Sequence, residues 1–227
     1  MEQSKIWDFF QNNESVADDV FNSSTRYKFL AEKASIGSDV LNIGVGRGGL
    51  ESFLLKNKVN VYSLDPSEKS INYVKERYKL GERAKVGFSQ VIPFEDDSFD
   101  VVIMTEVLEH LDSKVLQETI SECHRVLRKG GIFIGTVPAD EKLSTSLVVC
   151  PCCDNKFHRW GHVQSFSYIN LHNLISGRFE KVKIKRQHFG NWGKLNLSGK
   201  LGCFIKKILI KLGRKGDNEN YYFSGEK

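Results

Sequence analysis

Residues 39–49 read DVLNIGVGRGG. A short, mostly apolar run, typical of a buried parallel strand, leads directly into four glycines. Glycines between a strand and a helix let backbone N–H groups approach a ligand closely, because no Cβ stands in the way. This stretch therefore predicts a buried strand, a ligand-binding loop and the start of a helix.

Strand-like and helix-like segments alternate on the C-terminal side of this loop. Apolar runs begin at Val59, Phe99 and Ile132, and segments with helical spacing of apolar residues lie between them. Strands that alternate with helices are typical of a parallel sheet. We expect an α/β fold in which a doubly wound, Rossmann-like sheet carries helices on both faces.

Asp65 ends the second apolar run, where its carboxylate can accept hydrogen bonds from both hydroxyls of a ribose. The loop and this acid together suggest a nucleoside-containing ligand. The glycine spacing fits two classes of ligand. Gly44, Gly46 and Gly49 match the dinucleotide pattern G-x-G-x-x-G, which would make the protein an NAD-dependent oxidoreductase. Gly44, Gly46 and Gly48 match a G-x-G-x-G loop equally well.

Two later stretches distinguish these interpretations: IPFEDDSFDVVIMTEVLEHL, residues 92–111, and VLRKGGIFIGTVP, residues 126–138. The first resembles the fourth-strand region of class I S-adenosylmethionine-dependent methyltransferases, and the second resembles the helix, turn and fifth strand of that fold. The resemblance covers roughly residues 35–140. It implies a seven-stranded sheet, S-adenosylmethionine as the cofactor and S-adenosylhomocysteine as the product. An oxidoreductase would leave the first stretch unexplained.

The resemblance also implies which residues hold the cofactor. Gly44, Gly46 and Gly48 would line its methionine and ribose side. Asp65 would bind the ribose hydroxyls, and Pro66 would shape the turn beside the adenine. Four further positions are implied along the adenine edge and near the methionine moiety: Ser89, Gln90, Thr105 and Glu106.

Two positions depart from the family pattern. Asn42 stands where the family usually has an acid, and Phe88 stands where it often has one. Asn42 can still form hydrogen bonds in the cofactor site, but it adds no negative charge.

Transfer of a methyl group from a sulfonium requires mainly that the methyl group and its nucleophile are aligned. A base is needed only where the nucleophile starts protonated. His110 is the candidate base, while Glu109 is expected to be a surface or packing residue.

A cysteine- and histidine-rich insert at about 141–165 offers a second site. Cys150, Cys153, His158 and His162 follow the pattern C-x2-C-x4-H-x3-H, and two thiolates with two imidazoles can hold a structural zinc ion. The alternative is a loop of reduced thiols that packs on the core. Because the insert follows the fifth strand, we expect it to lie over the ligand-binding edge as a lid or an acceptor-specificity element.

The domain organisation follows from these features. We expect an N-terminal helical cap, 1–34, and a methyltransferase domain, 35–227, which includes a basic amphipathic helix at about 199–212. Residues 181–227 carry a net charge of +9 and residues 1–180 carry −4. This helix should pack its apolar face on the sheet, or alternatively lie on an anionic membrane surface.

The composition indicates which classes of protein this chain can belong to. With 227 residues, of which 40% are hydrophobic and 27% charged, the chain is typical of a globular protein. It has no apolar run of about 18 residues and an odd number of cysteines. Its first residues are not typical of a secretory signal, so we expect none. We expect a cytoplasmic protein, peripheral at the inner membrane surface if the basic helix binds there. The expected acceptor is a small molecule or a glycan. The alternative is an RNA-binding protein or RNA methyltransferase that uses the Cys/His-rich insert as a zinc knuckle, together with the basic segment 181–227.

Overall fold

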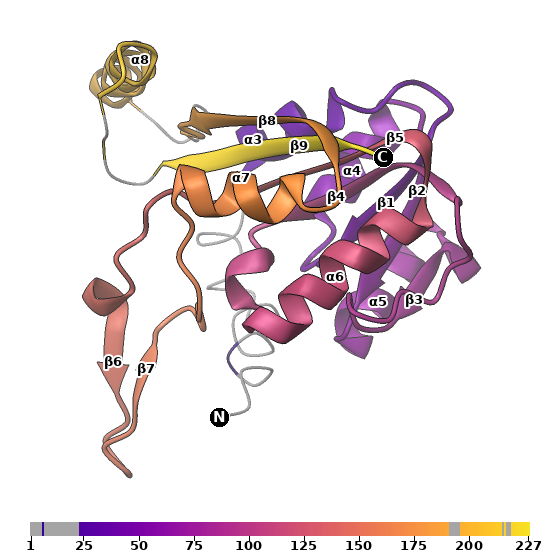
Figure 1. The fold of residues 1–227 in the computed structure, drawn as a ribbon, viewed down its shortest axis with the longest axis horizontal. Coiled ribbons are helices and arrows are strands. Elements are labelled where there is room, and N and C mark those ends of the chain that lie inside the picture. Colours follow the sequence, from indigo (N-terminus) through magenta and orange to yellow (C-terminus); the bar gives the residue numbers. More distant parts are fainter. Residues whose placement is uncertain (1–5, 7–22, 191–195, 215, 217–218) are drawn as a thin grey trace.

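The computed structural model describes residues 6, 23–190, 196–214, 216 and 219–227. A seven-stranded sheet of order β3-β2-β1-β4-β5-β9-β8 forms its centre (Figure 1). The strands are β1 (Asp39–Ile43), β2 (Asn60–Asp65), β3 (Ala84–Val86), β4 (Phe99–Thr105), β5 (Leu127–Pro138), β8 (Glu180–Gln187) and β9 (Asn220–Glu226). The predicted α/β fold with a doubly wound seven-stranded sheet is confirmed.

Strand direction places the ligand-binding edge. The first five strands in chain order run parallel, whereas β9 is antiparallel to both β5 and β8. Ile43 at the end of β1 pairs with Leu64 on one side and Met104 on the other, so the carboxyl ends of three strands lie level. The strand order reverses between β1 and β4, which is where open α/β sheets bind their ligands.

Helices cover both faces of the sheet (Figure 1). One face carries α3 (Ser24–Ala31), α4 (Gly49–Lys56) and α5 (Glu68–Tyr78), and the other carries α6 (Ser113–Val126) and α7 (Tyr168–Ser176). Side chains of β1 alternate between two hydrophobic cores: Val40 packs with α4 and α5, while Leu41 and Ile43 pack with α6 and α7. Most of the cap expected at 1–34 lies outside the described residues.

The insert at 141–165 is a short helical turn, η3 (Leu143–Ser146), followed by a two-stranded antiparallel hairpin, β6 (Leu147–Val149) and β7 (Lys156–His158). The hairpin projects from the body of the molecule (Figure 1). After the hairpin, the chain returns to the body at the end of β5.

The basic helix is α8 (Leu197–Lys211), and it stands apart from the sheet (Figure 1). Its apolar face is exposed: 61% of Leu201, 55% of Phe204 and 42% of Ile208 are accessible. The prediction that this face packs on the sheet was wrong, because the opposite side of the helix faces the body. There Cys203 is buried, with its Sγ 3.5 Å from Nε2 of His188. No helix of the described residues is long and apolar enough to cross a bilayer.

Candidate functional site at the carboxyl edge of the sheet

The glycine loop adopts backbone conformations that favour glycine. The φ angles are 83° at Gly44, 51° at Gly46 and 69° at Gly48, all in the left-handed region. Gly49 has no positive φ and begins α4, where an added Cβ would meet the Tyr27 ring at 2.5 Å. The three glycines with special conformations therefore follow the spacing G-x-G-x-G.

Asp65 lies at the carboxyl end of β2 and is buried. Its Oδ2 accepts a hydrogen bond of 2.9 Å from the backbone N–H of Val45, and its Oδ1 accepts one of 2.8 Å from Ser67. The carboxylate thus fixes the glycine loop against β2. Each carboxylate oxygen has a second lone pair, so Asp65 can also accept from ligand hydroxyls. Pro66, next in the chain, is exposed.

Asn42 is turned into the protein. Its Nδ2 donates a 2.8 Å hydrogen bond to Oε1 of Glu51 on α4, and the hydroxyl of Ser63 donates to the same oxygen at 3.0 Å. All three residues are buried. Burial raises the pKa of Glu51 to about 7. The acid that the family places on β1 is absent here, and a buried acid of α4 contacts that position instead.

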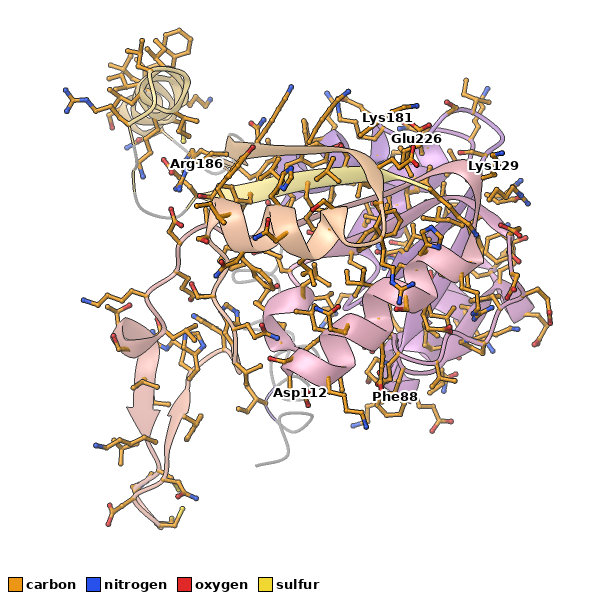
Figure 2. All side chains as sticks on the ribbon, viewed as in Figure 1. Phe88, Asp112, Lys129, Lys181, Arg186 and Glu226 are labelled. Carbon is orange, nitrogen blue, oxygen red and sulfur yellow. The ribbon has the colours of Figure 1, made fainter. Side chains whose placement is uncertain are left out.

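The segment after β3 presents an aromatic ring where the family often has an acid. Phe88 is 61% exposed and lies at the surface (Figure 2). The hydroxyl of Ser89 is 2.8 Å from that of Thr119 on α6, so its side chain is held by the protein. Gln90 is half-buried. An adenine at this edge would contact the Phe88 ring and the backbone of 88–90 rather than a carboxylate.

Glu106 is the most heavily bonded side chain at the end of β4. It has a positive φ of 55°, which costs energy in a residue other than glycine. Its carboxylate accepts hydrogen bonds from Asn220 at 3.0 Å and from Thr136 at 2.8 Å, and it pairs with Arg26 at 3.1 Å. The hydroxyl of Thr105 is 2.8 Å from that of Thr136. Sequence reasoning missed Arg26 and Asn220, which come from α3 and β9 and carry no local motif.

His110 is held as a neutral imidazole. Burial, with His162 nearby, lowers its pKa to about 3. Its Nδ1 lies 3.2 Å from the carbonyl oxygen of Gly161, which can only accept, so Nδ1 carries the proton and Nε2 the lone pair. A pKa this far below neutrality makes a poor general base. The surroundings therefore disfavour the role of base for His110.

The insert brings its two histidines to this edge without the cysteines. Nδ1 of His162 is 2.6 Å from Oε2 of Glu141, and Nε2 of His158 is 3.5 Å from the other oxygen of that carboxylate. The hairpin register pairs His158 with Leu147, which places Cys150 and Cys153 beyond the strands, in the turn. Among the described residues, the groups of three or more metal-binding side chains contain neither cysteine. The structure does not assemble the expected zinc knuckle.

Glu109 is buried at the centre of this edge. It is 1% exposed, and within the described part of the chain neither carboxylate oxygen has a hydrogen-bond partner. Burial, and then the charge of Glu106, raises its pKa well above the usual range. The sequence analysis expected Glu109 to be a surface or packing residue. It did not predict a buried carboxylate without hydrogen bonds.

Comparison with known proteins agrees with this architecture. Residues 41–135 match the family described as Methyltransferase domain. A Mycolicibacterium smegmatis protein named a probable S-adenosylmethionine-dependent methyltransferase is 35% identical over 112 residues, which cover 49% of this chain and 42% of that protein. The chain spans about half the length of the curated relatives that it matches.

Solved structures share the fold at low sequence identity. The 1,6-didemethyltoxoflavin-N1-methyltransferase of Burkholderia thailandensis, solved with bound 1,6-didemethyltoxoflavin and S-adenosylhomocysteine, has a TM-score of 0.67 at 13% identity over 99% of this chain and 86% of that one. A SAM-dependent methyltransferase of Archaeoglobus fulgidus has a TM-score of 0.66 at 17% identity, with 100% of each chain covered. At such identities the likeness establishes the fold alone.

Proposed function

The chain contains a class I S-adenosylmethionine-dependent methyltransferase domain, and from this premise we propose that it transfers the methyl group of S-adenosylmethionine to a small-molecule or glycan acceptor. The observation that carries the proposal is the placement of Asp65, a buried carboxylate at the end of β2 bonded to the glycine loop. The family match and the name of the relative do not favour an oxidoreductase or an RNA-binding protein.

The glycine loop leaves open space beside Gly46. An added Cβ at Gly46 would meet no atom within 4 Å, so this glycine borders open space, whereas Gly44 already abuts Val107 of the next loop. In our proposal the backbone of the loop holds the methionine and ribose side of the cofactor. Asp65 takes the ribose hydroxyls, with Pro66 shaping the turn.

The other cofactor residues divide into two groups. Gln90 and the backbone of 88–90, with the Phe88 ring, take the adenine; Thr105 and Glu106 lie near the methionine moiety. Asn42 and Ser89 act indirectly, since their side chains are bonded to Glu51 and Thr119. The cofactor supplies an activated methyl group, and these residues orient it.

Binding measurements on two matched variants test the cofactor site. Asp65→Ala should lose at least about tenfold in affinity for S-adenosylhomocysteine, because two hydrogen bonds to a charged group contribute about 1.5–3 kcal/mol each. Glu68→Ala removes the same charge three residues away, at an exposed position. This control should bind as the wild type does, and equal affinities of all three proteins would overturn the assignment.

We also propose that α8 lies on an anionic membrane surface. The exposed stripe of Leu201, Phe204 and Ile208 points away from the body, and residues 196–216 contain six Lys or Arg and no acid. An apolar face flanked by cations is suited to the interface of an anionic bilayer. At such a surface a lipid-linked glycan would be within reach as the acceptor.

A further inference from the structure

We propose that Glu109, His110 and His162 form a binding site for a divalent transition-metal ion. The ligand atoms of these three residues all lie within 4.8 Å of one another. Glu109 and His110 come from the loop after β4, and His162 comes from the insert. The loop and the insert are joined there, since the backbone N–H of Val163 donates a 2.9 Å hydrogen bond to the carbonyl of Glu109.

The Glu109 carboxylate is the first support for a cation. A buried carboxyl group is normally hydrogen-bonded, paired with a charge or bound to a metal, because an unsatisfied one is costly. Glu109 is 1% exposed, and both of its oxygens are without a hydrogen bond from any described residue. A cation between it and the two histidines would give this buried carboxylate a partner.

The two imidazoles are oriented as metal ligands. Nδ1 of His110 donates to the Gly161 carbonyl at 3.2 Å, and Nδ1 of His162 donates to the Glu141 carboxylate at 2.6 Å. With Nδ1 engaged in this way, Nε2 is the nitrogen of each ring that would coordinate an ion. Metal-bound histidines typically donate their other N–H to a carboxylate or a backbone carbonyl in this way. Glu141 and Gly161 are thus positioning groups for the two ligands.

His158 has a different role. Its Nδ1 accepts a 3.2 Å hydrogen bond from the backbone N–H of His162, so its proton is on Nε2, which points to Glu141 at 3.5 Å. Its ring stacks on that of His162, with 4.6 Å between the centroids. His158 therefore supports His162 and Glu141, and is not assigned as a ligand.

The donor set indicates the class of ion. Two imidazoles and one carboxylate suit Zn²⁺, Mn²⁺, Fe²⁺ or Co²⁺, and three protein ligands leave coordination positions open. If the proposed function is correct, an open position would take a hydroxyl oxygen of the acceptor, which makes an oxygen nucleophile the expected class. That last step rests on the proposed function, whereas the metal site itself does not.

Metal titration of the chelator-treated full chain tests the site. We expect one equivalent of Zn²⁺, Mn²⁺ or Co²⁺ to bind by calorimetry, and bound Co²⁺ to show visible bands without the near-ultraviolet thiolate charge-transfer band. Glu109→Gln should weaken binding by at least about 100-fold. Glu141→Gln, which removes only a positioning group at a partly exposed residue, should weaken it by about 10–100-fold.

The control is the double variant Cys150→Ser, Cys153→Ser, which should bind as the wild type does. Circular dichroism checks that each variant is folded. If Glu109→Gln does not fold, the metal affinity of Glu141→Gln serves as the test. The site is refuted if none of the three ions binds the wild type, or if binding survives the glutamate changes and is lost with the cysteines. S-adenosylhomocysteine binding, measured on the same preparation, separates failure of the metal site from failure of the proposed function.

Discussion

Nδ2 of Asn42 lies 2.8 Å from Oε1 of Glu51, in a buried pair that joins β1 to α4 beneath the glycine loop. The other carboxylate oxygen of Glu51 and Oδ1 of Asn42 both lack hydrogen-bond partners among the described residues. A proton on Glu51 relieves this arrangement, which agrees with the raised pKa of about 7.

This pair predicts a pH-dependent stability. Because the folded-state pKa of Glu51 is about 7 and its ordinary value is 4.5, its contribution is fully present below pH 4.5 and is lost as the pH rises to about 7. The loss amounts to about 3 kcal/mol. Glu51→Gln should remove that dependence and be more stable than the wild type at pH 8.

Urea unfolding of both proteins between pH 5 and pH 8 measures the effect as the difference between their free energies of unfolding. Glu76→Gln, a change at an exposed position of α5, is the matched control and should leave the profile of the wild type unaltered. A constant difference between the Glu51 variant and the wild type across this range would contradict the prediction.

Gly46→Ala should impair cofactor binding without a clash inside the protein. The new Cβ meets no atom within 4 Å, but it enters the space beside the loop, and the positive φ costs about 1 kcal/mol. Gly130→Ala, within β5, has the same open space and a positive φ of 79°. Both variants should lose similar stability, and only Gly46→Ala should bind S-adenosylhomocysteine at least about tenfold more weakly. Equal affinities would place the cofactor elsewhere.

The exposed face of α8 predicts binding to anionic vesicles at low salt, with less binding as salt rises. The double variant Phe204→Ser, Ile208→Ser should lose about tenfold or more in partitioning, since each side chain contributes about 1.5–3 kcal/mol when buried. Val91→Ser, at an exposed apolar residue of the body, is the control. Co-sedimentation is the readout.

Two results would contradict the membrane assignment. One is absence of sedimentation with anionic vesicles. The other is self-association of the wild type that the double variant abolishes, which would assign the face to a second copy of the chain.

The fold could be predicted from local patterns, because the apolar residues of each strand and each helix recur with the period of that element. The glycine loop and Asp65 were recognisable for the same reason, since they lie next to strand ends. The partners of Glu106 could not be recognised in the sequence. Arg26 and Asn220 lie 80 and 114 residues away from it along the chain and belong to no motif.

In the insert, the spacing of the four candidate ligands did not predict where the structure places them. C-x2-C-x4-H-x3-H suggested four ligands, but a hairpin register separates the cysteines from His158. The groups that do meet the histidines, Glu109 and Glu141, lie on other segments. Likewise, the periodicity of α8 identified an apolar face correctly, whereas the direction of that face depends on the contact between Cys203 and His188, which no local pattern predicts.

Calorimetric titration of the wild-type chain with S-adenosylmethionine, S-adenosylhomocysteine and NAD tests whether the protein binds the methyl donor. We expect the first two to bind with micromolar affinity and NAD not to bind. Binding of NAD alone, or of none of the three, would contradict this expectation.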